Sequence, residues 1–134
     1  MNIPFTLSGK VEHGISLGNK YDMPTANITP GEDISALTLG VYCSVIAVGE
    51  KEYPSITNLG VRPTVNNDGR VNAETFIYDF AGNLYGLDVK VTLLEFIRPE
   101  KRFDSVDDLY LQIKEDLQKG AGYHRLASFS IASA

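Results

Sequence analysis

The sequence predicts a mainly β protein in which five or six short strands form a small closed or nearly closed antiparallel barrel, with one helix packed against it. Segments of strand character recur along the chain and are separated by turns rich in glycine, proline and asparagine. A helical spacing of apolar residues occurs once, near the C-terminal end. The alternation of strands and helices that a doubly wound parallel sheet requires is not found in the sequence.

The composition is typical of one globular domain that comprises residues 1–134. A chain of 134 residues that is 43% hydrophobic can bury a core. The net charge of -5 argues against binding to a nucleic-acid backbone, which normally needs a basic surface. No apolar run could span a bilayer, and residues 1–4 do not resemble a signal peptide. The single cysteine, Cys43, cannot form an internal disulfide, which fits a reducing compartment, so we expect a cytoplasmic protein. We also expect a monomer.

Two strands are expected in the N-terminal half of the chain. Residues 5–12 have strand character and lead into a glycine-containing loop at residues 14–21, whose backbone could approach a ligand closely. Residues 28–38 include a proline and a glycine and are predicted to form an irregular connection. Residues 40–48 are apolar at most positions on both faces of a strand, so this strand is predicted to be central in the sheet.

Three further strands are expected in the middle of the chain. The first covers residues 53–58, and Pro54 within it predicts an edge or a bulge because proline cannot donate a backbone hydrogen bond. The second covers residues 71–80, and the third, at residues 87–97, is the longest. One face of the strand at residues 71–80 carries Glu74, Phe76 and Tyr78.

The helix is expected to begin after Ser105, which is a good N-cap residue with Asp108 three positions later. Gly120 is expected to end it, and residues 120–134 are predicted to form a weakly patterned tail. The apolar stripe that should face the sheet consists of Val106, Leu109, Tyr110, Ile113 and Leu117.

The segment from Gly9 to Asn27 contains the first candidate functional residues. Thr25 and Asn27 lie two positions apart behind Pro24, so in an extended segment their side chains face the same way. A hydroxyl and an amide oxygen suit a hard cation whose charge is balanced mainly by phosphates. Taken alone, the same residues are more typical of a turn after Pro24 than of a ligand site, and Glu74 alone is most typical of a solvated strand residue.

A series of short motifs occurs in one order along residues 5–119. The motifs are Gly9-Lys10-Val11 with Gly14, Pro24-Thr25-Ala26-Asn27-Ile28, Gly40-Val41-Tyr42, Asn58-Leu59-Gly60-Val61-Arg62-Pro63-Thr64, Glu74 with Asp79-Phe80, Leu84-Tyr85-Gly86, Arg98-Pro99-Glu100 and Phe103-Asp104-Ser105. Each motif is weak alone, but together and in this order the chain resembles the riboflavin kinase family, either as a monofunctional enzyme or as the C-terminal half of a bifunctional riboflavin kinase/FAD synthetase. The resemblance implies a six-stranded Greek-key barrel with a C-terminal helix.

The resemblance also implies an activity: transfer of the γ-phosphoryl group of ATP to the terminal ribityl hydroxyl of riboflavin, giving FMN and ADP with Mg²⁺. By the family's pattern Glu74 would be the catalytic base, and Thr25 and Asn27 would hold the metal and the nucleotide phosphates. The remaining expected residues are Gly9, Gly14, Lys20 and Tyr85 at the ATP site, and Arg98, Lys101 and Phe103 at the flavin.

One segment, residues 19–23, departs from the family's usual pattern. Asn19 takes the place of a basic residue, which Lys20 could replace, and Asp22 stands where a glycine is usual. This departure supports a second hypothesis, a catalytically weakened flavin- or nucleotide-binding module of the same fold. A third hypothesis is that the chain is the kinase half of a longer native chain with an N-terminal FAD synthetase domain. In each case the partners are small molecules, with no nucleic acid or membrane.

Overall fold

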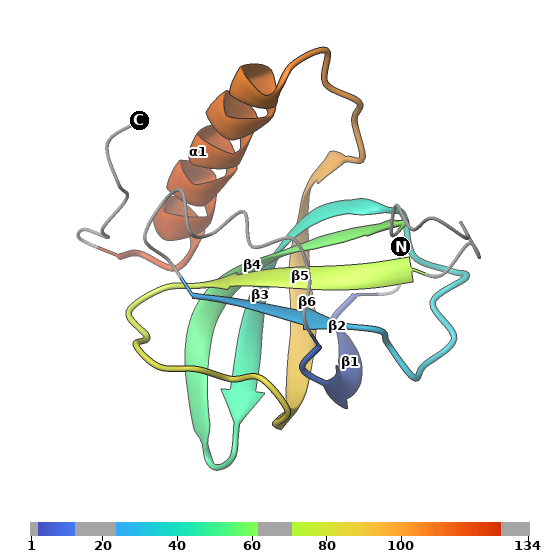
Figure 1. The fold of residues 1–134 in the computed structure, drawn as a ribbon, viewed down its shortest axis with the longest axis vertical. Helices are drawn as coiled ribbons and strands as arrows, with labels where there is room; N and C mark the ends of the chain where they lie inside the picture. Colours follow the sequence, from blue (N-terminus) through green and yellow to red (C-terminus); the bar gives the residue numbers. More distant parts are fainter. Residues whose placement is uncertain (1–2, 13–23, 62–70, 127–134) are drawn as a thin grey trace.

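Six antiparallel strands form one curled sheet with a helix packed against it in the computed structural model (Figure 1). The structure describes residues 3–12, 24–61 and 71–126. The elements are β1 (Phe5–Lys10), β2 (Thr25–Ile28), β3 (Gly40–Val48), β4 (Lys51–Val61), β5 (Val71–Ile77), β6 (Asp88–Pro99) and α1 (Val106–Tyr123). The prediction of a mainly β fold followed by a C-terminal helix is confirmed.

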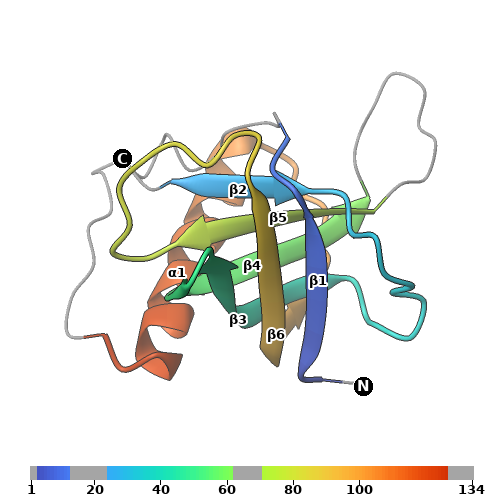
Figure 2. The same ribbon diagram turned by 90° about the horizontal axis from the view of Figure 1, so that it is seen from below.

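The strands follow the order β1-β6-β3-β4-β5-β2 across the sheet. β3, β4 and β5 are consecutive neighbours, and β6 returns to lie beside β3, which is a Greek-key arrangement. β3 is therefore central, as its two apolar faces predict. The sheet curls into a half-barrel (Figure 2), and its two edges meet where the Glu12 N–H donates to the Asn27 carbonyl at 2.7 Å.

The curled sheet has an apolar cluster on each face. The inner face holds the larger cluster, whose fully buried members include Leu7, Tyr42, Ile46, Leu59 and Val91. Helix α1 covers a smaller cluster on the outer face, formed by Val41, Ile56, Phe76, Tyr78, Ile113, Leu117 and Ala121. Two buried faces explain why the central strands are apolar on both sides.

In the described parts of the chain, no helix combines the length and apolar character that crossing a membrane requires.

Pro54 does not mark an edge strand, because β4 lies between β3 and β5. Pro54 is opposite Val45 of β3, and the ladder with β5 begins one residue later, at Ser55 and Ile77. The Pro54 carbonyl still accepts the Tyr78 N–H at 3.0 Å. Because the Pro54 carbonyl faces β5, the N–H that proline lacks would also face β5, beyond the last residue of that strand. No hydrogen bond of the β4–β5 ladder is therefore lost.

Helix α1 begins as predicted but continues past its predicted end. Ser105 is the N-cap, and its hydroxyl accepts the Asp108 N–H at 3.1 Å. The prediction that Gly120 ends the helix is wrong, since α1 runs to Tyr123, into the segment that we assigned to the tail. Gly120 instead allows close packing, because a Cβ atom there would lie 2.3 Å from the Cγ2 atom of Ile56.

The apolar stripe of α1 is also shorter at its start than we predicted. Val106 is 60% exposed and does not join the cluster under the helix. Ile113 and Leu117 are buried there, and the stripe continues to Ala121, beyond the predicted helix end.

Candidate functional site

One row of residues crosses the outer face of five strands. Asn27 of β2 is opposite Glu74 of β5, which is opposite Asn58 of β4. Asn58 is opposite Val41 of β3, which in turn is opposite Arg98 of β6. Residues directly opposed in an antiparallel pair share a face, with Cβ atoms about 5 Å apart. The row therefore joins Asn27 and Glu74 at one side of this face to Arg98 at the other.

The three residues expected to handle metal, phosphate and proton lie together at one end of this row. Glu74 is directly opposite Asn27, and Thr25 lies two residues before Asn27 on the same face. Ala26 and Ile28, which alternate with them, are buried in the inner core and so fix the outward direction of Thr25 and Asn27. Asn27 is 5% exposed and Glu74 is 7% exposed. A carboxyl group, an amide and a hydroxyl thus share a sheltered face.

Two asparagines beside these residues received no site role from the sequence. The Nδ2 atom of Asn72 donates to the Oδ1 atom of Asn27 at 3.2 Å, across β5 and β2. Asn58 is opposite Glu74 on the side away from Asn27. The signal that identifies both is the strand register, because the register alone shows that these asparagines share a face with Glu74.

A network of buried hydroxyls on the inner face fixes the register of β3, β4 and β5. The Ser44 hydroxyl lies 2.7 Å from that of Ser55 and 2.8 Å from that of Thr57, and Thr57 lies 2.9 Å from Thr75. All four side chains are fully buried and span β3, β4 and β5. A shift of one residue in the pairing of β5 with β4 would break this hydroxyl network and would turn Glu74 from the outer face to the inner one.

Gly9 lies where the two edges of the sheet approach each other. A Cβ atom on Gly9 would lie 3.1 Å from the Cβ atom of Ile28 and 3.2 Å from the Thr29 carbonyl. The observed role of Gly9 is therefore to let β1 approach the end of β2. This contact helps to hold the segment that carries Thr25 and Asn27.

Tyr85 lies in the connection between β5 and β6 and is 53% exposed. This connection is joined to the end of β1, since the Gly86 N–H donates to the Val11 carbonyl at 2.9 Å. The remaining residues expected at the ATP site, Gly14 and Lys20, lie outside the described residues. Residues 19–23, on which the hypothesis of a weakened module depends, lie outside them as well.

The three residues expected near the flavin also lie together, at the other end of the row. The guanidinium carbon of Arg98 lies 5.9 Å from the ring centroid of Phe103, and the Lys101 Nζ atom lies 5.6 Å from the same centroid. Arg98 forms an ion pair with Asp116 of α1, with 2.8 Å between Nη2 and Oδ2. Asp116 is 2% exposed, and the sequence had suggested no role for it.

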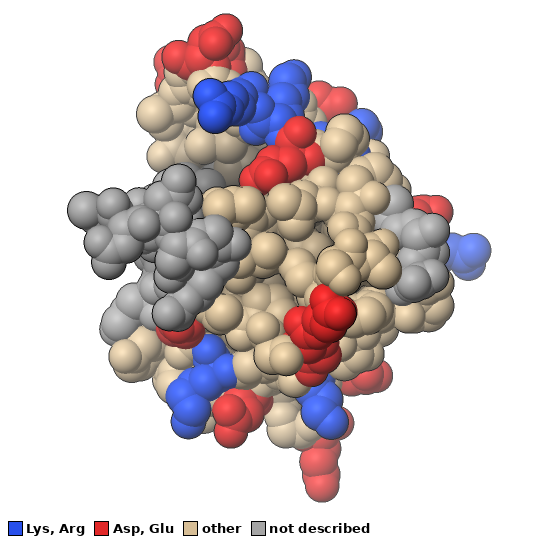
Figure 3. Space-filling model, turned by 90° about the vertical axis from the view of Figure 1, so that its right-hand side faces the viewer, with Lys and Arg blue, Asp and Glu red and all other residues tan. Residues whose placement is uncertain are grey.

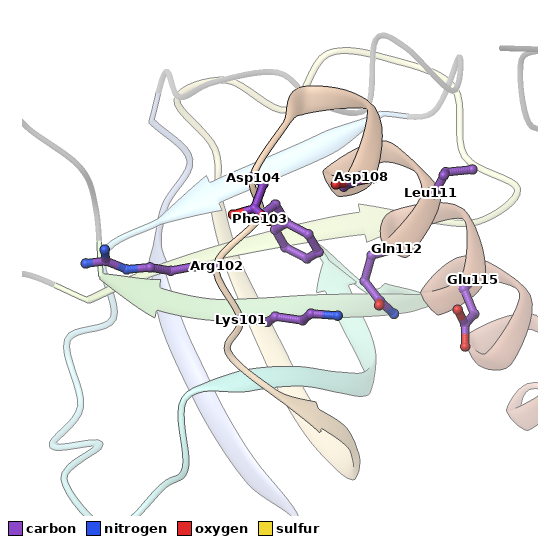
Figure 4. Close-up of a pocket in the computed structure, with 8 residues that line it drawn as sticks. All are labelled: Lys101, Arg102, Phe103, Asp104, Asp108, Leu111, Gln112 and Glu115. Carbon is purple, nitrogen blue, oxygen red and sulfur yellow. The ribbon is translucent and has the colours of Figure 1, made fainter.

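An open hollow of about 300 Å³ lies between residues 101–104 and the first half of α1 (Figure 4). Lys101 and Phe103 point toward the helix from one side, Gln112 faces them from the other, and Arg102 points away. The other residues around the hollow are Asp104, Asp108, Leu111 and Glu115. An aromatic side chain such as Phe103 is a suitable wall for a flat ring.

The riboflavin kinase family model matches residues 1–123 of the chain. The chain belongs to the riboflavin kinase family. Because the match begins at residue 1 and ends at the last residue of α1, it includes every strand and the helix of the described structure. The resemblance seen in the ordered motifs is therefore confirmed at the level of the family.

Individual proteins agree with this membership. The chain is 42% identical over 114 residues to the bifunctional riboflavin kinase/FMN adenylyltransferase of Escherichia coli K12, covering 84% of the chain and 36% of that protein. A solved Streptococcus pneumoniae structure titled a macrolide-efflux protein is 32% identical, with a TM-score of 0.73, and the match covers 93% of this chain and 40% of that one. A riboflavin kinase structure from Trypanosoma brucei shares the fold, with a TM-score of 0.59, 22% identity and 96% coverage of both chains. The chain thus spans little more than a third of the E. coli relative.

The resemblance to riboflavin kinases implies a divalent cation, and the residues at this site are of a kind that fits one. Among the residues that the structure describes, no group of three or more His, Cys, Asp or Glu side chains could hold a metal by itself. The oxygens at hand are the Thr25 hydroxyl and the Asn27 amide oxygen, with Glu74 beside them. Few, neutral protein ligands fit Mg²⁺, which keeps several waters and takes most of its charge balance from phosphates.

Charged side chains of both signs are present on the described part of one side of the molecule. Figure 3 shows acidic and basic side chains interspersed around a broad area of uncharged residues.

Proposed function

We propose that the chain is an ATP:riboflavin 5′-phosphotransferase that converts riboflavin and Mg-ATP to FMN and ADP. The observation that carries the proposal is the direct opposition of Asn27 and Glu74, with Thr25 on the same sheltered face. Family membership supplies the reaction class, and the register supplies an acid, an amide and a hydroxyl at one place. Phosphoryl transfer asks the protein mainly for alignment and charge stabilisation, with one group to accept a proton.

Glu74 is the base in this proposal. Its carboxylate accepts the proton of the terminal ribityl hydroxyl while that oxygen bonds to the γ-phosphorus of ATP. The bond from the γ-phosphorus to the bridging oxygen breaks, and its electron pair leaves with ADP. A positioned general base contributes roughly 10²–10⁴-fold to such a rate. The largely buried position of Glu74 keeps most water away from the carboxyl group.

Thr25 and Asn27 would hold Mg²⁺ and the nucleotide phosphates. The bound ion would neutralise charge on the β- and γ-phosphate oxygens. Asn27 suits this role because its Oδ1 atom accepts one hydrogen bond from Asn72 and has a second lone pair for a cation. The same hydrogen bond orients the amide so that oxygen, not nitrogen, is presented on this side.

The flavin ring would bind at the opposite end of the row, against Phe103 and near Arg98 and Lys101. Glu74 and Arg98 are three strand spacings apart across the sheet, which is roughly 14 Å at the usual spacing between strands. That separation suits a substrate whose flat ring and reactive hydroxyl lie at opposite ends of a ribityl chain.

The proposal assigns FMN, not FAD, as the flavin product of residues 1–134. The E. coli relative is named for two activities, riboflavin kinase and FMN adenylyltransferase, but the chain covers only 36% of it. The family model that matches the chain is that of riboflavin kinase. We therefore assign adenylyl transfer to the part of such longer proteins that residues 1–134 do not match.

The test is incubation of the purified chain with riboflavin, ATP and Mg²⁺, followed by chromatography of the flavins. We expect FMN and equimolar ADP, no FAD, and loss of FMN formation when EDTA is added, with recovery on excess Mg²⁺. Riboflavin binding without FMN under these conditions would contradict the proposal and would favour the weakened binding module instead.

A further inference from the structure

We propose that Asp116 is a positioning residue for the flavin end of the site: it holds Arg98 in place against Phe103 and thereby sets the affinity for riboflavin. The inference rests on the proposed function, because it concerns the substrate that the hollow beside α1 takes. Asp116 is 2% exposed, so it acts on a ligand only through the residues that it contacts.

The first step is the contact between Asp116 and Arg98. The Arg98 Nε atom donates to the two carboxylate oxygens at 2.9 and 3.1 Å, and Nη2 donates to Oδ2 at 2.8 Å. Two donors of one planar guanidinium meeting one carboxylate fix both the position and the plane of the arginine side chain. This arrangement leaves Nη1 to donate to the Pro99 carbonyl at 3.1 Å.

The second step leads from Arg98 to the wall of the hollow. The fixed guanidinium lies 5.9 Å from the Phe103 ring centroid, and Lys101 lies 5.6 Å from it. Both distances fall within the range of cation–π attraction. Phe103 and Lys101 line the hollow themselves, so the position of Arg98 determines how this wall is presented.

The third step concerns the opposite wall. Gln112 lines the hollow from α1, and its Nε2 atom donates to the Oδ1 atom of Asp116 at 3.1 Å. One buried carboxylate therefore fixes side chains on both sides of the hollow, the Arg98–Phe103 side and the α1 side. The arrangement is suited to a flat ring inserted between them, because the walls are ordered before the ligand arrives.

The substitution Asp116→Asn tests this role. It replaces a carboxylate oxygen, which accepts from Arg98 or Gln112, with an amide nitrogen that can only donate. We expect the Kd of riboflavin, measured by quenching of its fluorescence without ATP, to rise about tenfold or more, the loss expected for one charge-assisted contact. In turnover, the KM for riboflavin should rise similarly, while the KM for Mg-ATP should stay within about twofold because the Asn27–Glu74 end is unchanged.

A second variant is needed because Asp116→Asn leaves the partly buried Arg98 guanidinium with fewer acceptors and could lower the stability of the fold. Arg98→Lys keeps a positive charge beside Asp116 but removes the planar, two-donor contact. It should weaken riboflavin binding with little change in melting temperature. The control is Lys119→Gln, which breaks the exposed Lys119–Glu115 ion pair on the same helix and should change neither constant.

Unchanged riboflavin affinity in folded Asp116→Asn and Arg98→Lys would overturn the inference and leave the proposed function intact. A lower melting temperature with unchanged affinity would likewise show a merely structural ion pair. If the unmodified chain binds riboflavin but forms no FMN, the proposed function fails while the binding comparison still tests Asp116. If the unmodified chain binds no riboflavin, both fail.

Discussion

At the scale of single residues, the proposed site depends on which residues are directly opposed on neighbouring strands. Glu74 is an ordinary strand residue in the sequence, and only the register places it beside Asn27 and Asn58. Asn72 then holds the Asn27 amide by a hydrogen bond of 3.2 Å. The family's motifs predicted Thr25, Asn27 and Glu74 as a set. Asn58 begins one of the motifs but received no site role there, and Asn72 belongs to none of them. The strand partners that bring both asparagines to this face cannot be read from the sequence.

Removal of the Asn72 amide tests its support of Asn27. In Asn72→Ala the Asn27 amide loses the hydrogen bond that orients it, so we expect the Mg²⁺ concentration for half-maximal FMN formation to rise about tenfold, as for other residues that orient metal ligands. Riboflavin affinity should not change. Thr6→Ala, which removes the exposed hydrogen bond between Thr6 of β1 and Thr92 of β6, is the matched control. An unaltered Mg²⁺ requirement would remove Asn72 from the site.

Cys43 provides a prediction at the same scale. Burial, together with the nearby negative charge of Glu95, raises the pKa of the Cys43 thiol to about 11. Because the thiolate is the reactive form, native protein at pH 8 should react with iodoacetamide very slowly, and unfolding in guanidinium should restore the rate of a free cysteine. Mass spectrometry of the labelled chain measures both rates. Rapid labelling under native conditions would show that the outer face under α1 opens readily.

At the scale of elements, helix α1 links the sheet to the proposed flavin end. Its central and C-terminal residues cover the outer apolar cluster, and its side chains Gln112 and Asp116 reach the hollow and Arg98. The sequence predicted the start of this helix well, because the N-cap signal is local. It placed the end wrongly, because the reason for Gly120 is contact with β4 and with Tyr78, which no local pattern contains.

Two glycines of α1 allow a matched test of that contact. In Gly120→Ala the added Cβ would lie 2.3 Å from Ile56 and 2.5 Å from the Tyr78 hydroxyl, so we expect a loss of about 1–3 kcal/mol in the free energy of unfolding. In Gly122→Ala the new Cβ meets nothing within 4 Å, and alanine's helix propensity should add up to about 1 kcal/mol. Urea denaturation measures both. Equal effects of the two substitutions would contradict this packing.

At the scale of the whole molecule, the half-barrel is drawn together by contacts between segments far apart in the sequence. The Thr29 hydroxyl donates to the Glu12 carboxylate at 2.6 Å, and the Ser8 N–H donates to Glu32 at 2.8 Å. These contacts join β1 to the connection that follows β2 and so help to fix the segment with Thr25 and Asn27. The sequence predicted this connection to be irregular, which it is, but residue types alone do not say which polar partners they will meet.

Glu32 makes this closure sensitive to acid. Partial burial raises the pKa of Glu32, but hydrogen bonds from the Ser8 hydroxyl and N–H and from the backbone of Glu32 and Gly31 outweigh it, and the net pKa lies below the ordinary value of 4.5. The folded state therefore binds its proton less readily, so the contribution of Glu32 to stability is present above pH 4.5 and is lost as the pH falls through the lowered pKa. Glu32→Gln should show a smaller loss of stability on acidification than the unmodified chain, measured by urea denaturation at several pH values. The control is Glu50→Gln in the exposed β3–β4 turn, and a slope unchanged by Glu32→Gln would contradict the role of this contact.

The fold as a whole was more predictable than the site. Strand alternation and turn residues are local, and they predicted the strands at residues 40–48, 71–80 and 87–97 to within a few residues. Strand order, register and the ion pair of Asp116 are not local, and the sequence alone left them open. The motifs supplied a partial substitute, because family membership carries the topology with it.

The central claim is that Glu74 accepts the proton of riboflavin's terminal hydroxyl at the face that it shares with Asn27, and single-turnover FMN formation by Glu74→Gln tests it most directly. Glutamine keeps the size of the side chain but cannot take up the proton, so with saturating riboflavin and Mg-ATP we predict a rate lower by roughly 10²–10⁴-fold, with both affinities and the melting temperature retained. FMN formation by Glu74→Gln at the rate of the unmodified chain would contradict the account.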